Sequence, residues 1–313
     1  MIIGHKKQWA FLKKAAQSKK FSHAYLFCGQ ARLGKKKIAL EWISLLFNKP
    51  VEEIAVEGFH PDLVFIEPQA KEIQIPQIRE LIWKLSLKPS LAGLKVAVIN
   101  DAHLMNEEAQ SCLLKTLEEP RGNALLILIT DKPQYLFPTI LSRVQTVKFH
   151  QVPKEEIKNY LMKEGASGKE AEEIAEISSG KPGKALDIMS GKEKLEDLVK
   201  KMQELDKLSQ SSLSSRFQYV KDLAENPENV QNTFEIWLNY FRNVLLSRFA
   251  SNEKFKNQAS ERSEGKKENE TLFAKYSIPK LKKIINLIQT TNTVISSTNV
   301  NSRLALETLM LEI

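Results

Sequence analysis

The sequence predicts an α/β domain built on a parallel sheet, followed by a region that is entirely helical. Short apolar runs, such as residues 96–99 and 124–129, alternate with amphipathic patterns, as expected for parallel strands covered by helices on both faces. An earlier run, residues 24–28, leads into a glycine-rich segment with the spacing of a phosphate-binding loop. From Leu195 onward, apolar residues recur at helical spacing.

Composition is that of an ordinary globular protein large enough for two or three domains. The chain has 313 residues, of which 42% are hydrophobic and 27% charged, with a formal net charge of +8. Its lysines fall in scattered runs without interleaved aromatic residues, so solvated faces explain the charge at least as well as a DNA-binding groove. Met1 leads straight into lysines without an apolar signal segment, and the densest apolar run is too short to cross a bilayer. We therefore expect a cytoplasmic protein without membrane contact.

The two cysteines do not indicate a metal site. Cys28 and Cys112 both fall within apolar patterns and have no ligand spacing, so we expect buried free thiols. Residues 48–58, where a zinc module could follow a phosphate-loop helix, contain no cysteine. We expect no structural metal.

The phosphate-binding loop is Gly29-x4-Gly34-Lys35, set between a strand and a helix. In an active loop, backbone amides cradle the phosphates, the lysine reaches the outer ones, and a following Ser or Thr hydroxyl binds magnesium. Here that last position is Lys36, whose ammonium cannot coordinate a cation and repels it. Two interpretations fit equally well: a site that holds phosphate without catalysis, and a relic turn kept for folding.

The middle of the chain predicts strand, helix, strand, short helix and a turn that carries Arg143. The run 96–99 ends at Asn100 and Asp101, which places polar groups at the carboxyl end of a strand. Asn106 is a candidate helix N-cap because two glutamates follow it in the first turn.

Four segments together resemble one family, the AAA+ clamp-loader ATPases of bacterial DNA replication. They are SHAYLF (22–27), the Asp-Ala-His turn (101–103), LLKTLEEP (113–120) and TILSR (139–143). The resemblance implies an AAA+ core with a parallel sheet over residues 1–151, a small helical lid over 152–192 and a helical collar for oligomerisation over 193–313.

The resemblance also implies that this chain has lost its own ATP chemistry. The active Walker B pattern aligns with Asn100 and Asp101, which puts an amide where the metal needs a carboxylate. Gly183 stands where the lid of active members carries a sensor arginine. With Lys36, these are three independent losses. We expect no ATPase activity from the chain alone and no required cofactor, and the sequence leaves open whether ATP or ADP still binds at Gly29, Gly34 and Lys35.

Ser142 and Arg143 match the family pair that projects into the ATP site of an adjacent subunit as an arginine finger. Guanidinium suits that task because it is always charged and can fork two donors onto a phosphate. The alternative is a surface arginine paired with a nearby carboxylate. The surrounding match favours the finger.

Three hypotheses follow. The favoured one is a non-catalytic subunit of the clamp loader of DNA polymerase III, partnered by gamma/tau and delta subunits and, through the complex, by the sliding clamp and primed DNA. An active gamma/tau-like ATPase is the alternative, but it needs a hydroxyl, a carboxylate and an arginine that are replaced here. A free-standing basic DNA-binding protein is the third, and it predicts DNA affinity that falls steeply with salt.

The carboxy-terminal region predicts helices that share one core. A long apolar stripe includes Val230, Trp237 and Phe249, and core packing explains it far better than a cofactor site. Residues 251–271 are nearly all polar and predict a flexible loop. Residues 299–313 resemble the closing helix of clamp-loader collars.

Overall fold

The computed structural model describes residues 2–55, 60–69, 71–119, 122–192, 195–225, 227–252, 276–297 and 300–312. The chain divides into two compact units, Met1–Ser190 and Gly191–Ile313. In the described ranges, no helix combines the length and the apolar character that crossing a membrane requires.

The first unit is built on a five-stranded sheet with the order β2-β3-β4-β1-β5. Every pair of neighbouring strands is parallel, as the sequence predicts. The strands are β1 (Ala24–Cys28), β2 (Leu63–Ile66), β3 (Lys95–Ile99), β4 (Ala124–Thr130) and β5 (Gln145–Lys148). Because all five run the same way, their carboxyl ends gather at one edge, where α/β sheets place their ligands.

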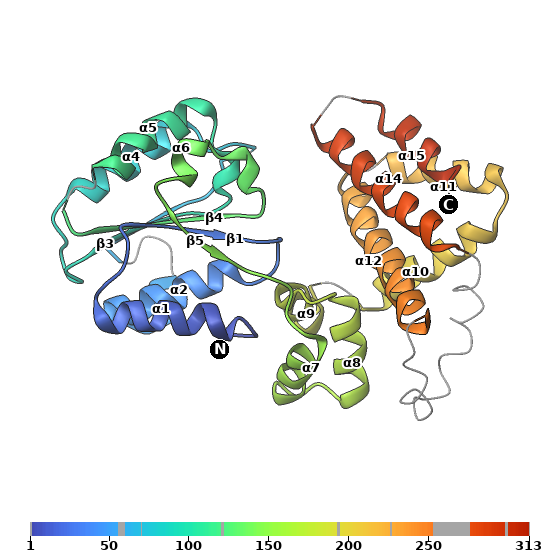
Figure 1. The fold of residues 1–313 in the computed structure, drawn as a ribbon, viewed down its shortest axis with the longest axis horizontal. Helices are drawn as coiled ribbons and strands as arrows, with labels where there is room; N and C mark the ends of the chain where they lie inside the picture. Colours follow the sequence, from blue (N-terminus) through green and yellow to red (C-terminus); the bar gives the residue numbers. More distant parts are fainter. Residues whose placement is uncertain are drawn as a thin grey trace. The chain divides into compact units, whose positions relative to one another are not determined.

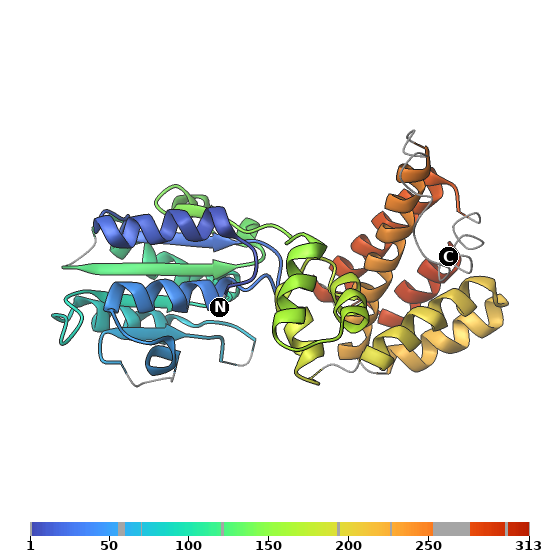
Figure 2. The same ribbon diagram turned by 90° about the horizontal axis from the view of Figure 1, so that it is seen from below.

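Helices cover both faces of this sheet, with α4, α5 and α6 on one side and α1 and α2 on the other (Figure 1). Figure 2 shows α1 and α2 side by side across the face turned to the viewer. The helices are α1 (Lys6–Ser18), α2 (Lys35–Phe47), the short α3 (Val51–Ala55), α4 (Ile75–Ser86), α5 (Glu107–Glu118) and α6 (Pro138–Leu141), with the 3-10 turns η1 (Ala102–Leu104) and η2 (Pro133–Tyr135).

The strands alternate their side chains between two apolar cores. Phe27 and Val98 pack with Trp42 on the α1–α2 side, while Leu26 and Leu113 belong to the core beneath α4 and α5. Both faces are therefore buried, which explains why the strands read as continuous apolar runs. Both cysteines were predicted to be buried. Cys28 is buried, whereas Cys112 on α5 is only half-buried.

Helix α5 begins as predicted, because the Asn106 side chain accepts a hydrogen bond from the amide of Ala109 at 2.9 Å.

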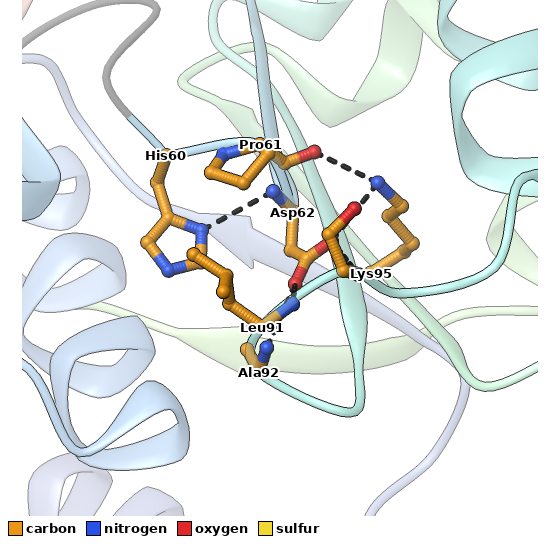
Figure 3. A network of polar contacts seen from close by, with 7 residues as sticks. His60, Pro61, Asp62, Leu91, Ala92 and Lys95 are labelled. Atoms are coloured by element: carbon orange, nitrogen blue, oxygen red, sulfur yellow. Dashed lines mark hydrogen bonds and ion pairs between the residues drawn. The ribbon is translucent and has the colours of Figure 1, made fainter.

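At the amino ends of β2 and β3, a buried ion pair fixes the loop after α4 (Figure 3). The Asp62 carboxylate lies 2.9 Å from the Lys95 ammonium. It also accepts hydrogen bonds from three successive backbone amides, those of residues 90–92, at 2.7–2.8 Å. Burial alone raises the pKa of Asp62, but these amides and the ammonium outweigh it and hold the pKa well below its usual range.

Three helices follow the sheet within the first unit: α7 (Lys154–Lys163), α8 (Gly168–Ile177) and α9 (Pro182–Met189). They bury a small apolar set of their own, including Ile157, Leu161 and Ile174. These helices are the region predicted to be a lid, and its separation from the core at residues 151 and 152 stays a prediction.

The second unit contains, in its described residues, α10 (Leu195–Gln210), α11 (Leu213–Ala224), α12 (Pro227–Asn252), α14 (Ile278–Ser297) and α15 (Ser302–Met310). The predicted stripe on α12 is buried at Val230, Phe234, Trp237 and Phe241, whereas the side chain of Phe249 lies outside the described residues. The start predicted for the polar loop is wrong, because α12 continues through Ser251 to Asn252. Residues 253–271 lie outside the described part of the chain.

Candidate functional site

The candidate nucleotide site lies at the carboxyl edge of the sheet, where the loop between β1 and α2 carries the phosphate-binding spacing. The loop needs both of its glycines. A Cβ at Gly29 would clash with the carbonyl oxygen of Phe149, and Gly34 caps α2 with a φ of 87°. The amino end of α2 follows this loop directly, so its backbone amides lie at the carboxyl edge of the sheet.

Lys35 does not extend from this loop. Its ammonium donates to the carbonyl oxygens of Gly29 at 2.5 Å and Gln30 at 2.7 Å. The residue is 7% exposed, and burial lowers the pKa of the ammonium. These two hydrogen bonds leave one of the three ammonium donors for another acceptor.

Lys36 and Asn100, two of the predicted losses, are brought together by Glu67. The Lys36 ammonium lies 2.8 Å from Glu67 Oε1 and over the ring of Phe65. The Asn100 amide donates to the same Glu67 oxygen at 3.3 Å and to Asp101 Oδ2 at 3.0 Å. An ammonium and an amide therefore share a carboxylate where an active site would set a hydroxyl and a carboxylate around magnesium.

Sequence reasoning missed Glu67, although one signal was present. It directly follows β2, so it stands at the same sheet edge as Asn100 after β3. Asp101 has a left-handed φ of 50°, and burial raises the pKa of its carboxyl. These residues do not fit a magnesium ion, because Lys36 brings a positive charge and Asn100 no negative one. In the described part of the chain, no group of three or more His, Cys, Asp or Glu residues is arranged to hold a metal.

A second polar group joins this edge at the end of β4. His103 Nδ1 lies 3.1 Å from the hydroxyl of Thr130 and 3.4 Å from Asp131 Oδ1. Burial lowers the pKa of His103, so the neutral imidazole is favoured. These contacts tie the Asp-Ala-His turn to the neighbouring strand.

Gly183, the third predicted loss, lies directly against the phosphate loop. Its amide donates to the carbonyl oxygen of Arg32 at 2.8 Å, and a Cβ at this position would lie 2.8 Å from the same oxygen. Asp187, one turn further along α9, lies 3.8 Å from the Arg32 guanidinium. The position expected to carry a sensor arginine is therefore a close backbone contact between α9 and the loop.

Arg143 follows α6 and is held by its own chain. Its Nη2 lies 2.7 Å from Glu118 Oε1 at the end of α5. Its Nη1 donates to the carbonyl oxygen of Thr139 at 2.9 Å and to the hydroxyl of Ser142 at 3.1 Å. About a third of the arginine side chain stays exposed. The carboxylate partner considered from the sequence is thus present in the isolated chain, and the finger role stays a prediction.

Comparisons with known proteins agree with the resemblance in the sequence. A family model described as "DNA polymerase III, delta subunit" matches residues 4–153. The DNA polymerase III subunit delta' of Pseudomonas aeruginosa is 36% identical over 148 residues, which are 43% of this chain and 44% of that protein. The corresponding subunit of Bacillus subtilis is 32% identical over 178 residues, 54% of each chain.

A tau subunit also matches. The DNA polymerase III subunit tau of Bacillus subtilis is 26% identical over 282 residues, 80% of this chain and 50% of that protein. The chain thus spans about half the length of these relatives. Residues 4–153 of the chain therefore match the model of the DNA polymerase III delta subunit family, and the relatives that the chain matches include delta-prime subunits.

Proposed function

We propose that the chain is the delta-prime subunit of a clamp loader, a member that does not hydrolyse ATP itself and completes the ATP site of a neighbouring subunit with Arg143. One observation carries the proposal that the chain does not hydrolyse ATP itself: Lys36 and Asn100 both contact the carboxylate of Glu67. The matches to delta-prime subunits support the assignment to the loader.

The chemistry of phosphoryl transfer explains why this contact matters. Catalysis depends on a metal ion that neutralises developing charge and on groups that position the attacking water. The Lys36 ammonium places its own charge beside Glu67, at 2.8 Å, and therefore opposes a divalent ion there. Asn100 offers an amide, and Lys35 is engaged with loop carbonyls. Nucleotide binding without hydrolysis fits these residues better than turnover, and no cofactor is required.

The ion pair with Glu118 does not prevent Arg143 from acting on a neighbour. Both side chains are at least a third exposed, and exposed pairs are worth about 0.2–1 kcal/mol. An arginine finger contributes roughly 10³ to 10⁵ in rate, or about 4–7 kcal/mol. The gain at a neighbouring phosphate therefore exceeds the cost of leaving Glu118.

The proposed partners are the gamma/tau and delta subunits, with the sliding clamp and primed DNA reached through the assembled complex. The second unit is the proposed assembly region. Among its described residues, Leu246, Leu304 and Leu311 are each 59–61% exposed. Their burial against another subunit is part of the proposal.

A motor subunit is the second candidate, because tau of Bacillus subtilis matches over 80% of the chain. An assay with the isolated protein separates the two. We expect no magnesium-dependent release of phosphate from ATP above background, together with co-purification with gamma/tau and delta subunits. Turnover that Lys35→Ala abolishes would establish the motor, and a chain that never co-purifies with loader subunits would overturn the delta-prime assignment.

A further inference from the structure

The contact between Arg143 and Glu118 joins the end of α5 to the turn after α6, two helices that also share an apolar core through Leu117 and Ile140. Glu118 is the last residue of α5, and Arg143 lies in the turn after α6. A carboxylate in the last turn of a helix faces the negative end of the helix dipole, which is unfavourable. The arginine at 2.7 Å offsets that cost, so the pair is favourable where Glu118 alone is not.

The guanidinium is held from two sides, and the two sides differ. Nη1 is fixed by its own turn, through the Thr139 carbonyl and the Ser142 hydroxyl. The hydroxyl is itself oriented, because it donates to the same carbonyl at 3.0 Å. Within the described residues, Nη2 contacts Glu118 alone. If Glu118 moves away, Nη2 becomes free to donate to another acceptor. Nη1 stays fixed by Thr139 and Ser142, so the guanidinium keeps its orientation.

We propose that Glu118 is a latch that occupies the phosphate-facing edge of Arg143 in the free subunit and must let go before Arg143 binds a phosphate of its neighbour. Carboxylate and phosphate present the same chemistry to Nη2, an anionic oxygen that accepts a charge-assisted hydrogen bond. Glu118 is thus a positioning residue that competes with the neighbour's nucleotide for one donor. The first half of the proposal, that Glu118 occupies Nη2 in the free subunit, does not depend on the finger role of Arg143. The second half, that Glu118 must release Nη2 before Arg143 binds a phosphate of the neighbour, rests on that proposed role.

The first half can be tested on the isolated chain with phenylglyoxal, a reagent that modifies accessible guanidinium groups. The rate is followed by mass spectrometry of the peptide that contains Arg143. Glu118→Gln should raise that rate by about 1.4-fold to 5-fold, the factor that corresponds to an exposed ion pair of about 0.2–1 kcal/mol. Glu119→Gln is the matched control, since it removes the same charge one residue away. Glu119 is exposed, and no ion pair is recorded for it among the described residues.

Glu118→Asp separates a direct contact from a general effect of charge. It keeps the carboxylate but shortens its reach by one methylene, so a latch that works at 2.7 Å should weaken and the modification should again speed up. Equal rates for wild type, Glu118→Gln and Glu119→Gln would overturn the latch. An effect of Glu118→Gln that Glu118→Asp lacks would show that charge, rather than the contact, protects Arg143, and would also overturn it.

The second half is read in the reconstituted loader. Glu118→Gln should lower the KM for ATP by at most the same factor, and the change should vanish in an Arg143→Ala background. If the loader with Arg143→Ala works at the wild-type rate, the finger role of Arg143 is wrong. The phenylglyoxal result still shows whether Glu118 protects Arg143 in the free subunit. If Arg143→Ala slows the loader and Glu118→Gln matches its Glu119→Gln control in both assays, the finger stands and the latch is wrong.

Discussion

Replacing Gly183 by alanine tests the contact between α9 and the phosphate loop. The added Cβ would lie 2.8 Å from the carbonyl oxygen of Arg32 and 3.2 Å from its backbone carbons, closer than van der Waals contact allows. These are backbone atoms, so no flexible side chain can swing aside. Either α9 moves away and its 2.8 Å hydrogen bond to Arg32 is lost, or the loop shifts.

The expected cost follows from these contacts. Overpacking costs about 1–3 kcal/mol, and the lost hydrogen bond adds about 0.5–1.5 kcal/mol. Alanine regains up to about 1 kcal/mol of helix propensity over glycine. We therefore expect Gly183→Ala to lower the free energy of unfolding of the first unit by about 0.5–4.5 kcal/mol.

Urea unfolding followed by tryptophan fluorescence in a Trp237→Phe background provides the measurement, because Trp42 is fully buried in the first unit and Trp237 would otherwise report on the second. With a slope of about 2 kcal/mol/M, a loss of 2 kcal/mol moves the midpoint by about 1 M. Gly168→Ala is the control: it starts α8 and has no atom within 4 Å of an added Cβ, so its midpoint should stay or rise. Equal midpoints for the two variants would refute the close approach of α9 to the loop.

Three further predictions concern other parts of the chain. Lys36→Thr restores the hydroxyl but leaves the Asn100 amide in place, so phosphate-release assays on the isolated chain should still show background rates, and turnover would contradict the account. Asp62→Asn leaves the buried Lys95 ammonium without its counter-charge and should cost about 3–5 kcal/mol in thermal or urea unfolding. Because the pKa of Asp62 is held below its unfolded value, its stabilisation is present above about pH 4 and lost as the pH falls further; the wild type should show this acid loss and Asp62→Asn should not. Deleting α15 (Ser302–Met310) removes residues that are fully buried in the second core, so the helical circular dichroism of the second unit should melt at lower temperature.

Local sequence patterns predicted the fold well, because each element carries its own signal. Apolar runs gave the strands at 96–99 and 124–129, and the actual β3 and β4 extend each by one residue. Asn106 was identifiable as a cap because its side chain bonds within its own turn. The predicted loop was placed too early at Ser251, because α12 continues to Asn252.

The site was predictable only as a set of substitutions, because its contacts join residues far apart in the sequence. Lys36 and Asn100 could be identified from the sequence as replacements of magnesium-binding residues. Neither segment, however, carries a pattern that predicts their shared contact with Glu67. Gly183 could be aligned with a missing arginine, whereas its hydrogen bond to Arg32 depends on how α9 meets the loop.

The central claim is that the chain contributes to ATP hydrolysis through its neighbour's site and not through its own. The most direct test compares Arg143→Ala with Lys35→Ala in the reconstituted loader, after gel filtration confirms that both variants assemble. Clamp-stimulated ATPase activity and clamp loading should fall with Arg143→Ala and stay at the wild-type level with Lys35→Ala. Arg143→Lys should rescue poorly, because an ammonium cannot fork two donors onto a phosphate. A loader slowed by Lys35→Ala and unaffected by Arg143→Ala would contradict the account.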